Sequence, residues 1–278
     1  MNKKLLSLYS LKFNPFLPDV PVEALWIPPV LDSFCWRIEQ QVGEGGFALA
    51  LGQPGSGKSA ALRVLRARLG SLREVSVGLV TRPQAGLADF YRELGEVFGV
   101  PLRPHNRWAS AKVLRDKWLQ HIDNSLCRPV ILIDEGQECG VAVLSELRLL
   151  SSADLDSRSI LTVVIAGDSR LAAKLDSPEL LPLASRVRSR LRAEPLAAAQ
   201  LLECLAHRLK AAGNPKLLSP GLAQTLCDHA AGNLRLLMNM ADELLAAACR
   251  QELDRLDEKL YFEVFALDPK PVAKRAVA

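Results

Sequence analysis

The sequence predicts an α/β protein, with helices on both faces of a parallel β-sheet and a smaller all-helical part after it. Three observations carry this prediction. Short apolar runs of the kind that form buried strands alternate with helical stretches over most of the chain. One of these runs leads into a glycine-rich loop, and the loop opens a helix. From about Glu194 onward the pattern is helical only.

The glycine-rich loop has the G-x-x-x-x-G-K-[ST] pattern of a phosphate-binding loop. It follows the apolar run 47–51 and precedes a helical stretch from Ala60 to Leu69, which is the context this pattern needs. Glycines let backbone N–H groups turn toward phosphate oxygens, and the helix N-terminus adds a favourable dipole. Lys58 is expected to reach the β- and γ-phosphates, and Ser59 to ligate Mg²⁺. The predicted nucleotide contacts in this loop are Gly52, Gln53, Pro54, Gly55, Ser56, Gly57, Lys58, Ser59 and Ala60.

A second motif stands at the end of another buried strand. The run from Pro129 to Ile133 is continuous and apolar, as expected of a central parallel strand, and Asp134 and Glu135 follow it directly. An acid at this strand end suits the Mg²⁺ shell, so Asp134 is a predicted nucleotide and metal contact together with Ser59. Glu135 is placed to orient and deprotonate an attacking water, which predicts hydrolysis rather than nucleotide binding alone.

The patterns divide the chain into four parts. Residues 1–28 are rich in proline and aromatic residues, which predicts an extended, ordered arm rather than a helix. Residues 29–193 are the predicted sheet domain, with a helix at 31–42 and strands at 47–51, 75–80, 130–133, 160–166 and near Leu191. Residues 194–265 are the helical domain, with helices at 196–212, 220–231 and 234–252 and one short final helix. Residues 266–278 are expected to form a disordered tail.

Composition limits the class and the compartment. The 278 residues are 49% apolar, which is ample for a core, and the net charge of +4 permits a polyanionic partner without requiring one. Six scattered cysteines form no C-x-x-C pair, which disfavours a metal site built on cysteine and fits a reducing cytoplasm. The first apolar run is too short for a signal peptide, and no run approaches the length of a membrane span. We therefore expect a cytoplasmic protein without a membrane partner.

With these motifs in place, the chain resembles an AAA+ ATPase over roughly residues 10–262. Beyond the two motifs, the resemblance rests on the strand 160–166 followed by Gly167-Asp168, on an arginine cluster at 186–192, and on Gly232-Asn-Leu-Arg235. The last is similar to the G-x-x-R sensor 2 motif of the AAA+ lid. The resemblance implies a three-layer αβα domain with a helical lid, ATP and Mg²⁺ as cofactors, and ATP hydrolysis at a site shared between subunits.

Finer details resemble one branch of this class. The segment from Ile133 to Gln137 resembles the D-E-A-Q form of the second motif, and the segment from Glu146 to Ser151 resembles the E-L-R-L-L-[ST] helix of ExeA-type ATPases. The same broad group includes transposon ATPases of the MuB, TniB and TnsC type. Secretion members usually continue into a transmembrane segment and a peptidoglycan-binding domain, whereas this chain stops just after the lid. That difference favours the transposition branch.

Two functions follow from these resemblances. The first is an ATP-dependent, oligomeric regulator of DNA transposition that forms a ring or filament on duplex DNA. It would select target sites and activate a transposase, with a target-selection protein as a further partner. The alternative is an ExeA-like ATPase that drives assembly of a secretion or export apparatus. DNA-stimulated ATPase activity would separate the two.

The resemblance also implies individual roles. Asp168 follows a strand expected to lie between the two motif strands, and it either senses the γ-phosphate or only caps the next helix. Arg186, with Arg188 as second choice, is the expected arginine finger toward the neighbouring subunit's γ-phosphate, because a guanidinium is always charged and binds phosphate bidentately. Arg235 is the expected sensor 2, the alternative being an ion pair with a structural carboxylate.

Three further predictions concern contact surfaces. Phe13, Pro15 and Phe16 of the arm either cover the adenine face of the nucleotide or only pack on the core. Gln137 either relays between the γ-phosphate and the oligomer interface or is an ordinary polar residue at a helix start. The loop after the second strand combines cations, an aromatic residue and small polar side chains. It either makes sequence-independent contacts with DNA phosphates or is a plain surface loop with Trp108 packed inward. The predicted DNA contacts are Arg103, His105, Asn106, Arg107, Trp108, Ser110 and Lys112.

Overall fold

The structure is a computed structural model that describes residues 2–103 and 105–265. The chain divides into two compact units, each with its own apolar core. One unit is Ile27–Pro195, and the other combines Met1–Trp26 with the chain from Leu196 onward. The predicted tail, residues 266–278, lies outside the described residues.

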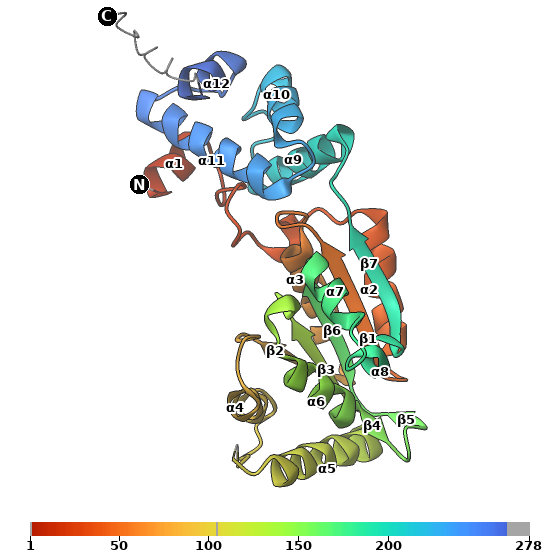
Figure 1. Ribbon diagram of the computed structural model, residues 1–278. Coiled ribbons are helices and arrows are strands. Elements are labelled where there is room, and N and C mark those ends of the chain that lie inside the picture. Colours follow the sequence, from red (N-terminus) through yellow and green to blue (C-terminus); the bar gives the residue numbers. More distant parts are fainter. Residues whose placement is uncertain (1, 104, 266–278) are drawn as a thin grey trace, which may run out of the picture. The chain divides into compact units, whose positions relative to one another are not determined.

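The unit Ile27–Pro195 is built on a five-stranded sheet with the order β2-β3-β6-β1-β7 (Figure 1). The strands are β1 (Gly46–Gly52), β2 (Val75–Val80), β3 (Arg128–Ile133), β6 (Thr162–Gly167) and β7 (Val187–Ala193). All four neighbouring pairs are parallel. The predicted α/β fold on a parallel sheet is therefore confirmed, and β6 lies between the two motif strands as expected.

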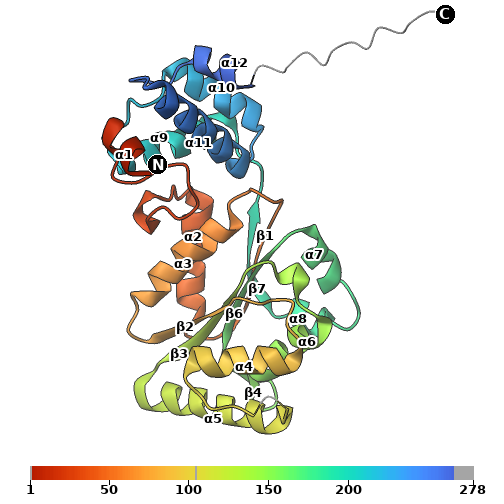
Figure 2. The ribbon, with the colours of Figure 1, turned by 90° about the vertical axis from the view of Figure 1, so that its left-hand side faces the viewer.

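Helices cover both faces of this sheet. Helices α2 (Pro29–Gln41) and α3 (Lys58–Gly70) lie on one side, and α6 (Val141–Ser151), α7 (Ser169–Leu175) and α8 (Leu181–Ala184) lie on the other (Figure 2). Helices α4 (Leu87–Phe98) and α5 (Arg107–Ser125) connect β2 to β3 and join the core on the α6 side. A short 3₁₀ helix, η2 (Gly136–Glu138), precedes α6, and another, η1 (Val22–Ala24), belongs to the second unit.

Alternate residues of the central strands pack into opposite layers. Phe47 and Leu49 of β1 belong to the core cluster shared with α4 to α7, whereas Ala48 and Ala50 are equally buried but lie outside that cluster. Successive side chains of a strand point to opposite faces, so a strand covered on both faces is apolar at every position. This explains why β1, β3 and β6 were visible in the sequence as continuous apolar runs.

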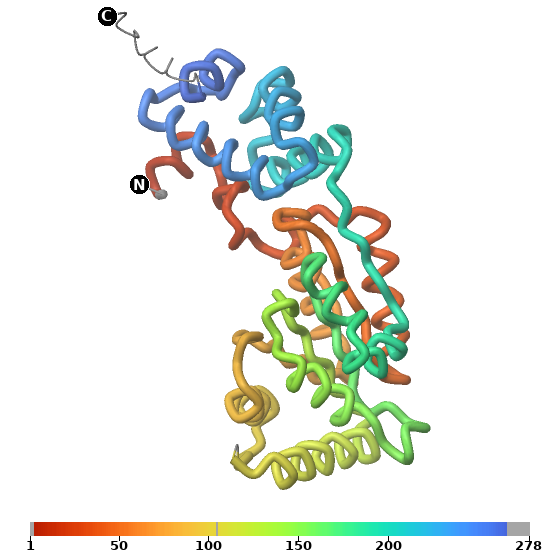
Figure 3. Tube along the Cα trace, viewed as in Figure 1, coloured from red at the N-terminus to blue at the C-terminus, as the bar shows by residue number. Residues whose placement is uncertain are grey.

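The structure adds a short hairpin that the sequence analysis did not predict. Strands β4 (Ser152–Ala153) and β5 (Arg158–Ser159) pair antiparallel between α6 and β6. Two-residue strands are too short to leave an alternating pattern in the sequence. The tube in Figure 3 traces the connecting turn as a green loop at the margin of the unit.

The second unit is helical. Its elements are α1 (Asn2–Leu8), η1, α9 (Ala198–Ala212), α10 (Pro220–Ala230), α11 (Leu234–Gln251) and α12 (Glu258–Phe265). The helices predicted after residue 194 are present, with boundaries shifted by up to two residues. In the part of the chain that the structure describes, no helix combines the length and apolarity needed to cross a bilayer.

The arm is not extended throughout, which corrects the prediction for its first residues. Residues 2–8 form helix α1, because Leu5 and Tyr9 are four positions apart and bury one helical face in the core of this unit. The arm is also bonded to the later helices. Lys12 N donates to the carbonyl oxygen of Ala212 at 2.8 Å, and Asn214 Nδ2 donates to the carbonyl oxygen of Tyr9 at 2.9 Å. The arm is thus a structural part of the helical unit.

Candidate nucleotide-binding and hydrolysis site

The phosphate loop leaves the carboxyl end of β1, and α3 begins at Lys58. Gly55 and Gly57 have φ angles of 84° and 93°, which glycine adopts without strain. No side chain caps the first turn of α3, so its N–H groups face the loop as an anion site. A side chain does not fit at Gly52, where an added Cβ would lie 2.5 Å from both the Ala193 carbonyl oxygen and Ser56 Oγ.

The polar groups inside the loop fit a phosphate ligand. Lys58 is buried, and its Nζ donates to the carbonyl oxygens of Gly52 at 2.9 Å and Gln53 at 3.0 Å. Ser56 Oγ is buried and has no hydrogen-bond partner among the described residues. The Lys58 ammonium is bonded only to neutral carbonyls, and the Ser56 hydroxyl is unpaired among the described residues. Both groups are therefore donors suited to an anion.

Ser59 and Asp134 offer the oxygen donors that Mg²⁺ prefers. Mg²⁺ usually takes only one or two protein oxygens and completes its shell with waters and substrate phosphates. The described residues contain no group of three or more His, Cys, Asp or Glu side chains able to hold a metal by themselves. A donor set of one hydroxyl and one carboxylate therefore fits Mg²⁺ bound together with a nucleotide, and these two residues remain its predicted ligands.

A buried amide connects the ends of two neighbouring strands. Gln137 Nε2 donates to the carboxylate of Glu135, and Gln137 Oε1 accepts from the backbone N–H of Asp168 at 3.2 Å. Glu135 itself has a φ angle of 51°, a conformation that non-glycine residues adopt at a cost and that is frequent at functional sites. The geometry thus makes Gln137 a positioning residue for the predicted base, whereas its predicted relay to the oligomer interface stays a prediction.

Asp168 has the structural role that was one of its two predicted alternatives. Its Oδ1 accepts from the backbone N–H of Arg170 at 2.9 Å and caps α7. The Arg170 guanidinium bonds the same carboxylate and lowers the pKa of Asp168 below its usual value, and it also pairs with Glu138 at 3.1 Å. The sequence analysis assigned no role to Arg170 or Glu138. The Asp-x-Arg spacing at the start of a helix could have indicated the contact between Asp168 and Arg170. A sensor role for Asp168 stays a prediction.

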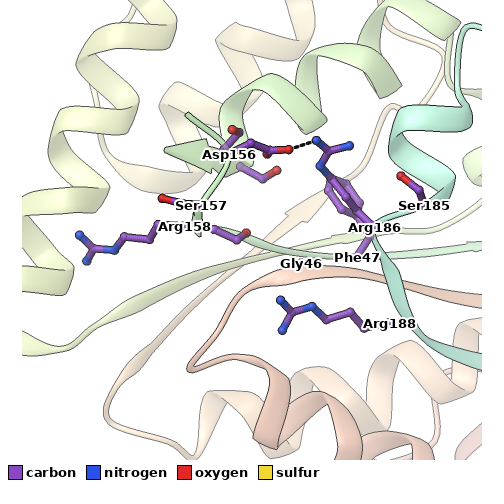
Figure 4. Close-up of a pocket in the computed structure, with 11 residues that line it drawn as sticks. Gly46, Phe47, Asp156, Ser157, Arg158, Ser185, Arg186 and Arg188 are labelled. Atoms are coloured by element: carbon purple, nitrogen blue, oxygen red, sulfur yellow. Dashed lines mark hydrogen bonds and ion pairs between the residues drawn. The ribbon is translucent and has the colours of Figure 1, made fainter. Parts of the chain in front are cut away.

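The two candidate finger arginines flank the start of β7. Val187 pairs with Phe47 and Ala193 with Gly52, so Arg186 lies near the amino end of β1 while the phosphate loop lies at its carboxyl end. Arg186 donates to the carboxylate of Asp156 and to the carbonyl oxygen of Pro182, and Arg188 pairs with Glu44. Figure 4 shows both arginines beside a hollow of about 420 Å³ at this end of the sheet.

The remaining nucleotide candidates belong to the helical unit. Arg235 is an exposed residue in the first turn of α11, and among the described residues it has no ion-pair partner, so the alternative of a structural carboxylate is not realised there. Phe16 is buried in the core of the helical unit, as the packing alternative predicted, and Phe13 packs against the same core. The Pro15 carbonyl oxygen accepts from Arg208 at 3.0 Å. Adenine contact by Phe13, Pro15 and Phe16, like the sensor 2 role of Arg235, stays a prediction.

Three residues of the predicted DNA surface have structural roles within the chain. Arg107 pairs with Glu146, a side chain only 3% exposed that also accepts from the Tyr91 hydroxyl. Ser110 is buried, and its hydroxyl donates to the Arg103 carbonyl oxygen at 2.7 Å. Asn106 caps α5 by accepting from the backbone N–H of Ala109 at 3.0 Å. Long-range pairing of this kind leaves no signal in a local pattern.

Six members of that surface are exposed, Asn106 and Arg107 among them. Arg103, His105 and Lys112 lie in the loop or on the exposed side of α5. Trp108 is 72% exposed, so it does not pack inward as the structural alternative had it. Lys112 Nζ lies 5.4 Å from the centroid of the Trp108 ring, a cation–π contact. Phosphate contact by these residues stays a prediction.

The fold and the phosphate loop together are similar to those of AAA domains. The chain has the AAA+ fold, and residues 40–175 match the family model described as an AAA domain. Among curated proteins, General secretion pathway protein A of Aeromonas hydrophila is 31% identical over 208 residues, which are 73% of this chain and 37% of that protein. The chain therefore spans well under half the length of this relative.

Solved structures support the same fold. Cdc6p from Pyrobaculum aerophilum superposes with a TM-score of 0.70 at 18% identity, over 90% of this chain and 70% of that one. The Aeropyrum pernix ORC1 protein, solved in complex with DNA, gives a TM-score of 0.65 at 20% identity, over 91% of this chain and 68% of that one. Domain III of the Thermotoga maritima replication initiation protein DnaA gives a TM-score of 0.59 at 18% identity, over 92% of this chain and 99% of that one. At these identities the likeness concerns the fold alone.

Proposed function

We propose that the protein is a Mg²⁺-dependent ATPase whose site is completed by a second copy, and that it serves the assembly of a secretion or export apparatus. The observation that carries the ATPase role is the meeting of three strand ends at one edge of the sheet. The phosphate loop follows β1, Asp168 follows β6, and Asp134-Glu135 follows β3. Because β1, β6 and β3 are adjacent and parallel, these groups share one edge.

The secretion role rests on the similarity to General secretion pathway protein A, which extends beyond the matched AAA domain to 73% of this chain. The other role considered, regulation of DNA transposition, has less support. Arg107 and Ser110 of the predicted DNA surface are bonded within the protein. The resemblance to ORC1, which was solved with DNA, is limited to the fold.

The residues present have distinct tasks in this proposal. Lys58 exchanges its bonds to loop carbonyls for phosphate oxygens, and the Ser56 hydroxyl and the N–H groups of the first turn of α3 add neutral donors. Ser59 and Asp134 would hold Mg²⁺ together with the nucleotide, and the bound ion would supply positive charge to offset that of the phosphates. Glu135, held by Gln137, accepts a proton from the attacking water.

In this proposal a second copy supplies Arg186, because Arg186 is remote from the phosphate loop of its own chain. Five residues of β1 separate Phe47 from Gly52, which at about 3.3 Å per residue is on the order of 16 Å. An arginine side chain extended from the far end of β7 does not span that distance within one chain. An arginine supplied by a neighbouring copy stabilises developing charge on the transferred phosphate, as arginine fingers do in related enzymes.

The test measures ATP hydrolysis against protein concentration, with and without duplex DNA. We expect Mg²⁺-dependent turnover that rises more than linearly with protein concentration and is insensitive to DNA. Glu135→Gln should bind ATP but not hydrolyse it, whereas Glu138→Gln, the same change three residues later, should leave turnover largely intact. Strong stimulation by DNA of any sequence would overturn the secretion assignment in favour of the transposition alternative. Unimpaired turnover in Glu135→Gln would remove the proposed base.

The shared site is tested by mixing two inactive variants. Lys58→Ala removes the phosphate contact and Arg186→Ala removes the finger, so each variant supplies what the other lacks. We expect partial recovery of turnover in the mixture, with mixed assembly checked by cross-linking. No recovery in confirmed mixed assemblies would place the whole active site in one chain.

A further inference from the structure

The ion pair on Arg186 is the starting point. Asp156 lies in the turn between β4 and β5, and its carboxylate accepts from Arg186 Nη2 (Figure 4). Arg186 Nη1 donates to the Pro182 carbonyl oxygen. The Arg186 side chain is 28% exposed and that of Asp156 46%. The candidate finger is therefore already bonded to an anion of its own chain, on a partly open surface.

The residues around this pair leave Asp156 as the main negative charge next to Arg186. The hollow is lined by five serines, three arginines, Gly46, Phe47 and a single carboxylate, that of Asp156. The hydroxyls of Ser151, Ser157 and Ser185 donate to nearby backbone carbonyls. Arg158 and Arg188 have carboxylate partners outside the lining, Asp123 at 3.4 Å and Glu44 respectively. Removal of Asp156 would leave a cationic hollow without its own counter-ion.

The segment that carries Asp156 is built to move more readily than the sheet. Asp154, Leu155 and Asp156 have φ angles of 51°, 55° and 70°, three consecutive left-handed residues without a glycine. The Leu155 side chain is fully exposed, and each flanking strand has only two residues. No apolar burial therefore fixes the tip, and the polar bonds of Asp156 and Ser157 are its main attachments.

We propose that Asp156 is an internal counter-anion that occupies Arg186 in separate copies and is displaced by a nucleotide phosphate when a second copy docks. This inference rests on the proposed role of Arg186 in the shared site. One anion replaces another on the same guanidinium, so Arg186 is never left unpaired. A phosphate outcompetes the carboxylate because it carries more charge and more acceptor oxygens for the planar donor fork. Assembly consequently competes with the Asp156 contact, which raises the protein concentration that turnover requires.

The experiment compares Asp156→Asn with Asp154→Asn. Both changes remove one carboxylate from the same turn, but the Asp154 carboxylate has no hydrogen-bond or ion-pair partner among the described residues. We expect Asp156→Asn to lower the protein concentration for half-maximal ATPase activity by about two- to fivefold, the factor that a half-exposed ion pair supplies. Asp154→Asn should leave it unchanged. Asp156→Asn combined with Arg186→Ala should be as inactive as Arg186→Ala alone.

A second measurement reads the contact directly and does not depend on assembly or turnover. Phenylglyoxal modifies accessible guanidinium groups, and peptide mapping in dilute protein reports the rate at Arg186. We expect faster modification of Arg186 in Asp156→Asn, and also in Asp156→Ser should the first variant fold poorly, with Arg188 as the internal control. An unchanged rate of phenylglyoxal modification at Arg186 would overturn this inference and leave the proposed function standing. The same holds if Asp156→Asn leaves the dependence of ATPase activity on protein concentration unchanged while Arg186→Ala is inactive. Full activity of Arg186→Ala would overturn both.

Discussion

The amide of Gln137 offers the sharpest test of how the predicted base is held. Gln137→Met keeps a side chain of similar volume and removes both hydrogen bonds, so it opens little cavity. Glu135 then loses a hydrogen bond to a charged group, worth about 1.5–3 kcal/mol when fully expressed. Since Glu135 is exposed, we take the lower end, which corresponds to about a tenfold fall in kcat.

The second bond gives a separate readout. The backbone N–H of Asp168 loses its acceptor, at a cost of about 1 kcal/mol in the free energy of unfolding. For a domain of this size that lowers Tm by about 2–4 °C. Gln137→Glu restores the acceptor for Asp168 but places a second carboxylate against Glu135. Repulsion between the two carboxylates should therefore keep both Tm and kcat below the wild-type values.

The assays are steady-state phosphate release, binding of a fluorescent ATP analogue, and thermal unfolding. ATP affinity should change less than twofold in both variants, because Gln137 makes no contact with the phosphate loop. Gln224→Met is the matched control, since Gln224 bonds Asp228 at an exposed position of α10. A kcat within twofold of the wild-type value in a folded Gln137→Met protein would refute the positioning argument. So would equal losses of kcat and ATP affinity.

Three other predictions follow from described contacts. Lys58→Ala should abolish the rise in Tm that ATP with Mg²⁺ gives the wild type, because binding to the folded state alone stabilises it; a retained rise contradicts the phosphate-loop assignment. Glu146→Gln should lower the free energy of unfolding by about 2 kcal/mol in urea, since the buried carboxylate serves both Tyr91 and Arg107; an unchanged midpoint refutes this. Burial raises the pKa of the Cys139 thiol to about 11, so it stays protonated at pH 8 and its reactivity should rise only as pH approaches that value. Cys127 is the one cysteine that is not buried, and a disulfide reagent at pH 8 should label one thiol rapidly in the wild type and none in Cys127→Ser.

The sequence was sufficient for the sheet and for the groups at its carboxyl edge. Strand β1, and strand β3 after its first residue Arg128, are apolar because both faces are covered, so their ends were found within one or two residues. The functional groups follow those ends directly in the chain. The position of these residues along the chain, next to a strand end, was therefore enough to predict where Lys58, Asp134 and Glu135 lie.

The partners of surface side chains could not be predicted in the same way. Arg107 and Glu146 are 39 positions apart, and Arg186 and Asp156 are 30 apart. Such pairs depend on how helices and turns meet in the folded unit, and no periodic pattern encodes them. For this reason neither the ion pair of Arg107 with Glu146 nor that of Arg186 with Asp156 was foreseen.

The packing of the arm against helices that follow residue 195 has a consequence for protein synthesis. Leu5, Tyr9 and Phe16 pack against helices that follow residue 195, so they wait while the whole of Ile27–Pro195 is translated. At about 5–20 residues per second this takes about 10 to 30 s. The contiguous sheet unit has time to fold in that interval, whereas the apolar arm stays exposed on the nascent chain. Chaperone capture at the ribosome should accordingly concentrate on the first residues, and ease only once α11 has emerged.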